Sequence, residues 1–483
     1  MDKRNWKIIY TSYKGMEKKA VELINKEMGA LILRDAGIYR IHVLPCEQVN
    51  NAVIDKNVVV VGLYDENEII RKYIKKDEIK QDGYVVKVTN EGENKVVLIT
   101  ANDEAALFYG AVDFVDDYFA FAIPKDHYPI RLTDEIFDSE LPDYYISSAP
   151  QIKTRNIFTW GHPITDYRNY IENMARLKLN QLIIWNDYVP LNAEDIVNYA
   201  HEYGIKVIWG FAWGWSRNCM DGEVNALEKL AETILENYKE NYLNLPGDGI
   251  YFQSFTEVNV DRIGDKLIAE AVVDLVNMVS AEIYKISPDL LIQFGLHATS
   301  VKERLQFIDK VDKRVEIIWE NCGAFPCSPT FPYWGDPMKV DDEEFEETIR
   351  FNDDIMALRD KGKIGILFKG FVTLDWCGDR FVHQKGPFVL GVSSERLKNH
   401  DKEMLKPIWR HFQTLYMKNG EYAYKMVKFI AEKRPDATVG VAAQLSGGIW
   451  FAHALVSQIL WECDKPYDEI FKKVSLRRSV EIV

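Results

Sequence analysis

The sequence has few cysteines, no long apolar run and no clustered positive charge. Its six cysteines are scattered over 483 residues, which argues against a disulfide framework. No stretch of about 18 uncharged apolar residues occurs, so no transmembrane helix is predicted. The net charge of -15 repels phosphate backbones, and no basic stripe offsets it. We therefore expect neither a membrane nor a nucleic acid as partner.

The first residues, MDKRNWKIIYTSYKG, carry charge but no apolar segment of the kind found in secretory signals. We expect a cytoplasmic protein, with secretion as the alternative if a leader preceded this chain. A length of 483 residues exceeds one ordinary core, so two or more domains are predicted. The sequence leaves the oligomeric state open, and a homodimer is one option.

Residues 1–140 alternate short apolar strands with helical patterns and predict a small α/β domain. WKIIYTS, NVVVVG, GYVVKVT and KVVLITA are typical of strands. The segment NDEAALFYGAVDFVDDYF predicts an amphipathic helix with Asn102 as its N-cap. The proline-punctuated stretch PKDHYPIRLTDEIFDSELPDYYISSAP, residues 124–150, predicts a linker. No cluster of candidate catalytic residues occurs in this region.

From residue 150 to residue 483 the pattern changes to strand, helix, strand, helix, which implies parallel strands joined by crossover helices. About eight such units fit a (β/α)8 TIM barrel with C-terminal helices. The eighth strand, in TVGVAAQLS, has the weakest pattern. A doubly wound sheet is the alternative, but no glycine-rich phosphate loop follows the first strand. The predicted fold class is therefore α/β: a TIM barrel preceded by a small α/β domain.

Polar and aromatic residues gather at the predicted C-terminal ends of the barrel strands, where barrel enzymes carry their chemistry. An aromatic face stacks on the apolar C–H face of a pyranose, while neighbouring polar groups bind its hydroxyls. The chain is rich in aromatics, with 12 Trp, 25 Tyr and 23 Phe. We predict a carbohydrate substrate bound by Trp160, His162, Asn186, Trp213, Trp215, Gln253, His297, Asn321, Lys369, Asp375 and Trp376.

Two glutamates are the predicted catalytic pair. Cleavage of a glycosidic bond normally uses two carboxyl groups, one of them protonated to donate to the leaving oxygen. Glu257 ends the apolar run in GIYFQSFTE, where burial against aromatics raises the pKa of a carboxyl group and suits it to the acid role. Glu320, in VEIIWEN, is the predicted base or nucleophile. Asp375 is the rival second carboxylate. The alternative role for Glu257 is a salt bridge or a helix cap, and the alternative for Glu320 is an ion pair with a neighbouring Arg or Lys.

The two histidines of this set have more than one possible role. His162 and His297 could bind hydroxyls, orient a carboxylate or serve as hydrogen-bonded scaffold residues. No compact H-x-x-H or H-x-H pattern supports a metal site, so we expect neither a metal nor an organic cofactor. A metal-dependent barrel isomerase remains an alternative, and so does a catalytically silent barrel that binds glycans through its tryptophans.

Most of the chain resembles the family 67 α-glucuronidases, in which an α/β domain similar to that of β-hexosaminidases precedes a (β/α)8 barrel. VVLITANDEAALFYGAVDFVDDY resembles the close of the first domain. SAPQIKTRNIFTW, MARLKLNQLIIWND and AHEYGIKVIWGFAW resemble the first three barrel strands with their preceding segments. TVGVAAQLSGGIWFAHALVSQILWECDKPYDEIF resembles the closing segment.

The resemblance implies roles for both glutamates. The family has its general acid at the end of strand four, where Glu257 stands, and a base-side Glu after strand six, where Glu320 stands. The family's Asp after strand five is replaced by His297, and its Trp-Asp-Asn signature by residues 160–162. The cations that could bind a uronic acid carboxylate are Lys369, Arg155 and Arg380.

The family 20 hexosaminidases offer an alternative. They share the domain order and an acid Glu after strand four, with an Asp directly before it that supports attack by the substrate's acetamido group. Thr256 holds that position here, and a hydroxyl cannot stabilise the developing positive charge as a carboxylate does. Substrate-assisted chemistry would therefore need another acid, such as Glu320 or Asp375.

Overall fold

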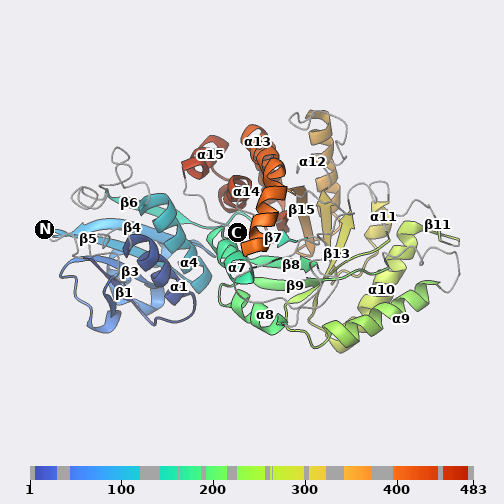
Figure 1. Cartoon of the computed structure of the whole chain (residues 1–483), viewed down its shortest axis with the longest axis horizontal. Coiled ribbons are helices and arrows are strands. Elements are labelled where there is room, and N and C mark those ends of the chain that lie inside the picture. The colour runs from blue at the N-terminus through green and yellow to red at the C-terminus, as the bar shows by residue number, and fades with distance from the viewer. Residues whose placement is uncertain are drawn as a thin grey trace. The chain divides into compact units, whose positions relative to one another are not determined.

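The computed structural model describes most of the chain (Figure 1). The described residues are 6–29, 44–119, 142–159, 164, 166–185, 192–214, 226–255, 262–263, 265–297, 304–321, 342–371, 395–443 and 450–476. Within these ranges the side chains of residues 51, 297, 321, 344, 369–371, 395–412, 415, 442–443 and 450 are not described.

The chain divides into two compact units. The first comprises Met1–Pro150 together with Glu202–Gly204 and Phe471–Ser479. The second comprises Gln151–His201, Ile205–Ile470 and Val480–Val483. The predicted fold class, a TIM barrel preceded by a small α/β domain, is confirmed.

The first unit is built on a mixed six-stranded sheet with the order β2-β1-β3-β5-β4-β6. Strands β1, β2, β3 and β5 run parallel, whereas β4 is antiparallel to both of its neighbours. A tight turn joins β4 to β5, and Gly92 adopts the positive φ of 60° that this turn needs. The strands are β1 (Trp6–Tyr10), β2 (Cys46–Gln48), β3 (Asn57–Leu63), β4 (Tyr84–Glu91), β5 (Asn94–Ala101) and β6 (Tyr144–Ser148).

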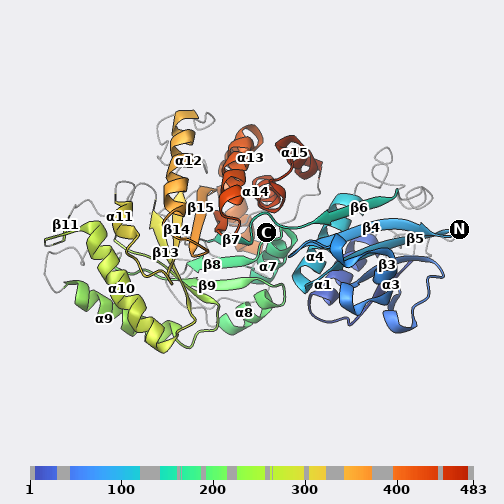
Figure 2. The same cartoon turned by 180° about the vertical axis from the view of Figure 1, so that it is seen from behind.

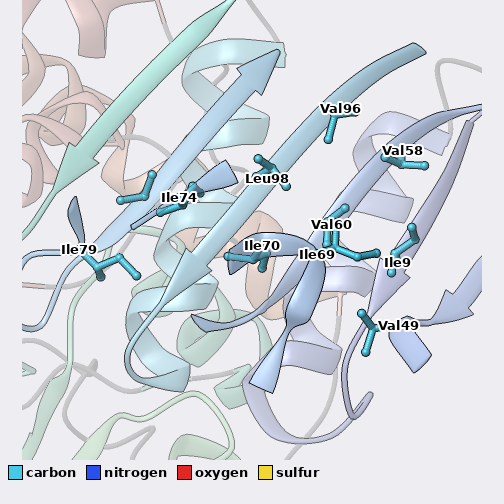
Figure 3. Packing of buried hydrophobic residues seen from close by; sticks show 11 residues of the cluster. Ile9, Val49, Val58, Val60, Ile69, Ile70, Ile74, Ile79, Val96 and Leu98 are labelled. Carbon is cyan, nitrogen blue, oxygen red and sulfur yellow. The ribbon is translucent and has the colours of Figure 1, made fainter. Parts of the chain in front are cut away.

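Helices cover both faces of this sheet. Helix α3 (Glu68–Tyr73) begins where the Asn67 side chain accepts hydrogen bonds from two backbone N–H groups. Its Ile69 and Ile70 join a buried cluster with alternate residues of the strands, such as Leu98 (Figure 3). Helices α1 (Gly15–Ile24) and α4 (Glu104–Asp113) pack against each other and against the sheet. The alternation of strand side chains thus supplies two apolar faces.

Two local predictions in this unit are wrong. The N-cap of α4 is Asp103, whose Oδ1 accepts a hydrogen bond of 2.9 Å from the Ala106 amide, and not Asn102. The sequence offers two capping residues in a row, and only the second is placed to bond the amide three positions on. Residues 144–148, predicted as linker, form the edge strand β6 and pair with β4. The tyrosines and the isoleucine of this segment favour a strand, but the neighbouring prolines indicated a linker.

The second unit contains a closed barrel of eight parallel strands in the order β10-β13-β14-β15-β16-β7-β8-β9. A closed barrel rules out the doubly wound sheet. The eighth predicted strand is present as β16. The strands are β7 (Thr154–Phe158), β8 (Gln181–Trp185), β9 (Lys206–Gly210), β10 (Gly249–Gln253), β13 (Leu291–His297), β14 (Glu316–Asn321), β15 (Ile364–Phe371) and β16 (Thr438–Ala443).

Helices follow the barrel strands, as a (β/α)8 architecture requires. They are α7 (Tyr167–Arg176), α8 (Ala193–His201), α9 (Ala226–Asn237), α10 (Ile268–Ile286), α11 (Leu305–Ile308), α12 (Asp342–Met356), α13 (Glu395–Lys433), α14 (Trp450–Glu462) and α15 (Tyr467–Leu476). A short hairpin, β11 (Arg262–Ile263) with β12 (Lys266–Leu267), precedes α10. Helices α9 and α10 run side by side in both views (Figures 1 and 2). In the described part of the chain, no helix combines the length and apolar character of a bilayer span.

The barrel interior holds one buried apolar layer made by alternate strand residues. It consists of Phe158, Ile183, Ile208, Tyr251, Ile318 and Leu367. Because side chains alternate across a strand, residues two positions before or after these also face the interior. That alternation places Gln253 and Glu320 directly above the layer, at the C-terminal ends of β10 and β14.

Candidate active site

Gln253 and Glu320 meet at the C-terminal end of the barrel. Gln253 is the last residue of β10 and pairs in register with Gly295 of β13. Glu320 of β14 pairs in register with His297 on one side and Leu367 on the other. Strand β13 lies between β10 and β14, so the two side chains approach each other across an intervening strand. The predicted acidic group on strand six therefore belongs to the barrel mouth.

The carboxyl group of Glu320 is held by two donors from one strand. The Tyr251 hydroxyl and the Gln253 amide nitrogen both donate a hydrogen bond to Glu320 Oε1. Gln253 Nε2 also lies 3.5 Å from the Tyr251 hydroxyl. Glu320 and Tyr251 are fully buried, and Gln253 is 4% exposed. An oxygen that accepts two hydrogen bonds suits a carboxylate, which acts only as an acceptor when ionised.

A glycine makes this contact possible. A Cβ atom at Gly295 would lie 2.5 Å from Tyr251 Cζ and 2.8 Å from Glu320 Oε1. Real side chains essentially never tolerate a heavy atom that close, so any larger residue would displace the tyrosine. The missing side chain on β13 is therefore what allows Tyr251 to reach Glu320 across that strand.

Trp185, the last residue of β8, also reaches the mouth. Its indole is only partly buried and packs edge-on against Phe158 and Tyr251, at centroid distances of 6.2 and 6.0 Å. Gly210 gives it room, because a Cβ there would lie 2.8 Å from Trp185 Cε3. Neither Trp185 nor Tyr251 was among the predicted binding residues. Strand alternation was the signal that could have found both, since each lies two positions from an interior residue.

Beneath the apolar layer lies a second polar group centred on Glu316. Its carboxyl oxygens accept hydrogen bonds from Thr438 Oγ1 at 2.6 Å and from Gln293 Nε2 at 2.9 Å. Gln293 Nε2 lies 3.3 Å from Gln181 Oε1. Burial raises the pKa of the Glu316 carboxyl group, and the two hydrogen bonds offset only part of this effect. Glu316 is thus a buried acid at the opposite end of the barrel interior from Glu320.

Trp213 does not lie where a sugar platform is needed. Its indole is fully buried and stacks on Phe252, with ring centroids 3.6 Å apart and planes 8° apart. Phe252 in turn stacks on Phe294, on the face of the strands opposite to Tyr251. The prediction that Trp213 stacks on a sugar is therefore wrong in this structure, because its ring is buried on the outer face of the barrel strands.

A segment of the first unit matches a known family model. Residues 19–114 match the glycosyl hydrolase family 67 N-terminus. The predicted resemblance to that family is confirmed as a distant relationship to glycoside hydrolases. No curated protein matches the sequence. A solved structure titled "Structure of CpGH84D" is similar over 98% of this chain and 89% of that chain, with 11% identity and a TM-score of 0.44.

The remaining predicted residues divide into two groups. His297, Asn321 and Lys369 lie in β13, β14 and β15, towards the C-terminal ends of those strands, and their side chains are outside the description. The predicted residues that lie outside the described ranges altogether are Glu257, Trp160, His162, Asn186, Trp215, Asp375 and Trp376. Of the predicted site, the structure therefore describes the side chains of Gln253, Glu320 and Trp213. Glu257 lies four positions beyond the end of β10 in the sequence.

Arg155 is not available to a uronic acid. Its guanidinium donates to the backbone carbonyls of Ile152, Lys153 and Lys178, at 2.8, 2.9 and 2.6 Å. It is 2% exposed, and its charged group lies 5.1 Å from the centroid of the Trp461 ring. The expectation that Arg155 could bind a carboxylate in the pocket is wrong, because the residue links backbone segments at the start of β7. Lys369 and Arg380 remain the candidates, and Arg380 lies outside the described residues.

The described residues contain no cluster of candidate metal ligands. Over those residues, no three His, Cys, Asp or Glu side chains come together in a way that could hold an ion. The chemistry that the described mouth offers is that of one buried carboxyl group, one phenol, one amide and a partly exposed indole.

Proposed function

We propose that the protein is a glycoside hydrolase of the α-glucuronidase type that uses Glu257 as general acid and Glu320 as base or nucleophile. The observation that carries the proposal is the Glu320 carboxyl group, held at the C-terminal end of a closed barrel by Tyr251 and Gln253. Barrel enzymes place their catalytic groups at this end. The family 67 match over residues 19–114 supports the reaction class.

The two glutamates would divide the proton transfers between them. Glu257 would donate a proton to the glycosidic oxygen as the bond to the anomeric carbon breaks. Glu320 would accept a proton from the attacking water if the reaction inverts the anomeric configuration. If the reaction retains it, the same carboxylate would attack the anomeric carbon directly. A carboxyl separation of about 6.5–9.5 Å corresponds to inversion and about 5–5.5 Å to retention.

The sugar would enter against an aromatic wall. Trp185 is the described aromatic residue that is partly exposed at the mouth and lies beside Tyr251. An indole face there suits the apolar face of a pyranose. Lys369 and Arg380 are the cations that would recognise a uronic acid carboxylate. The first substrates to test are therefore glucuronosyl oligosaccharides with α linkages.

The test is a substrate screen with matched variants. Wild-type protein is incubated with chromogenic glycosides and with oligosaccharides, including α-glucuronides and β-N-acetylhexosaminides, and released sugar is measured. Glu257→Gln should abolish turnover of any good substrate while the unfolding midpoint stays that of the wild type. Glu282→Gln is the control, because that glutamate lies on α10 and pairs with Lys285.

Three results would contradict the proposal. Wild-type activity in Glu257→Gln would remove the assigned acid. Binding to a glycan array without release of any sugar would instead indicate a catalytically silent glycan-binding barrel. A stoichiometric divalent ion in the purified protein, required for turnover, would point to a metal-dependent barrel enzyme.

A further inference from the structure

We propose that Tyr251 is the positioning residue for Glu320, and that the absence of a side chain at Gly295 leaves the room for this contact. The inference rests on the proposed function, since it assigns Tyr251 to the orientation of the catalytic carboxyl group. Tyr251 would not touch the substrate. It would act by holding one carboxyl oxygen of Glu320 so that the group faces the reacting centre.

The hydrogen bond between Tyr251 and Glu320 crosses an intervening strand, whose inward-facing side chains would normally occupy the space between them. Tyr251 lies on β10 and Glu320 on β14, and β13 lies between these two strands. Interior side chains of β13 would separate them. At the critical level β13 carries Gly295, and a Cβ there would meet both Tyr251 Cζ and Glu320 Oε1. The phenol therefore occupies the space that a side chain at position 295 would need.

The phenol itself is firmly placed. Its ring is fully buried and packs on Phe158 with centroids 4.8 Å apart, and on Trp185 at 6.0 Å. A tyrosine has two side-chain torsions, so packing on both sides leaves its hydroxyl little freedom. A hydroxyl fixed in this way can fix the group that accepts its hydrogen bond.

Two donors on the same oxygen determine how the carboxyl group lies. Tyr251 and Gln253 both donate to Glu320 Oε1. Two hydrogen bonds to one oxygen would restrict the rotation of the carboxyl group, and hence where Oε2 lies. A general base works only if its oxygen is aimed at the proton that it removes. Catalytic groups in general depend on such supporting hydrogen bonds for their orientation.

Tyr251→Phe tests the hydroxyl alone. With the glycoside that the wild type cleaves fastest, kcat should fall about 10–100-fold, the size of loss seen when a residue that orients a metal ligand is removed. KM should stay within about twofold, because the substrate contacts remain. The acidic limb of the pH profile should move to higher pH, since the carboxylate loses a donor that favours its charged form.

Tyr284→Phe is the matched control. Its hydroxyl, on helix α10, is buried and has no hydrogen-bond partner among the residues that the structure describes. That variant should keep the kcat and pH profile of the wild type. Gly295→Ala should reproduce the loss in Tyr251→Phe, and the double variant should be no worse than Gly295→Ala alone, because both changes remove one contact.

An infrared titration separates this inference from the proposed function. The band of the Glu320 carboxyl group is identified by its loss in Glu320→Gln, and its titration is followed in wild type and Tyr251→Phe. A shift to higher pH in Tyr251→Phe supports the positioning role even if no glycoside is cleaved. An unshifted titration, or a wild-type kcat and pH profile in Tyr251→Phe, would overturn it.

Discussion

The buried acid Glu316 gives the sharpest stability prediction. Its two hydrogen bonds, from Thr438 at 2.6 Å and Gln293 at 2.9 Å, lie inside the barrel. Replacement by leucine would leave both donors without their acceptor, at about 1–3 kcal/mol each. Replacement by glutamine keeps an acceptor for Thr438. The new amide at position 316 can donate to Gln293 Oε1, which has no partner among the described residues. This requires the side-chain amide of Gln293 to rotate by half a turn.

The pH dependence follows from the raised pKa of Glu316. A carboxyl group with a raised pKa in the folded state holds its proton there after the unfolded chain has lost its own. The stability that the neutral group contributes is therefore complete below the unfolded value of about 4.3 and is lost as pH rises towards the pKa of the folded state. Over that interval, the loss amounts to about 1.4 kcal/mol per pH unit.

Glu316→Gln removes this titration. The difference in free energy of unfolding between Glu316→Gln and the wild type should therefore shift in favour of the variant as pH rises above about 4.3. The shift should be up to about 1.4 kcal/mol per pH unit. Glu316→Leu should be less stable than Glu316→Gln at every pH, by about 2–6 kcal/mol. Urea unfolding from pH 5 to pH 8 measures both effects.

Glu421→Gln sets the baseline for this experiment, because that glutamate lies on helix α13 with 55% of its side chain exposed and pairs with Lys425. A constant difference in the free energy of unfolding between Glu316→Gln and wild type across this pH range would refute the raised pKa of Glu316. Equal stability of the leucine and glutamine variants would show that the two hydrogen bonds contribute nothing.

Two further predictions concern the aromatic wall and a helix cap. Trp185→Ala should raise KM for the best glycoside several-fold, while Trp213→Phe should leave KM unchanged and lower only the unfolding midpoint; the reverse pattern would restore Trp213 as the platform. Asp103→Ala should lower the stability of the first unit by about 1 kcal/mol through loss of the α4 cap, whereas Asn102→Ala should have little effect; thermal unfolding followed by circular dichroism distinguishes the two.

The barrel could be predicted from sequence because its signal is repetitive. Each apolar strand followed by an amphipathic helix adds independent support for the same fold. The ends of β10 and β14 were predicted closely enough to place Gln253 and Glu320 at the mouth. Local boundaries were harder, because Asn102 and Asp103 are equally good capping residues and prolines surround β6.

The composition of the site was only partly predictable. Reading the final residues of each strand finds the mouth but does not tell which residues face inward. Tyr251 was missed because it lies two residues before the end of β10, where its ring reaches Glu320 only through the gap at Gly295. Trp213 was wrongly predicted to bind the sugar because it comes soon after the end of β9. Its ring stacks on Phe252, on the outer face of the barrel strands. Contacts between distant strands are not visible in a single sequence.

The role of Glu320 in catalysis is tested most directly by kcat/KM of Glu320→Gln on the best glycoside. The amide keeps the size of the carboxyl group but can neither accept the proton nor attack carbon. We expect kcat/KM to fall about 10²–10⁴-fold, as for loss of a general base, while the unfolding midpoint stays that of the wild type. A value within about tenfold of wild type would show that Glu320 is neither base nor nucleophile.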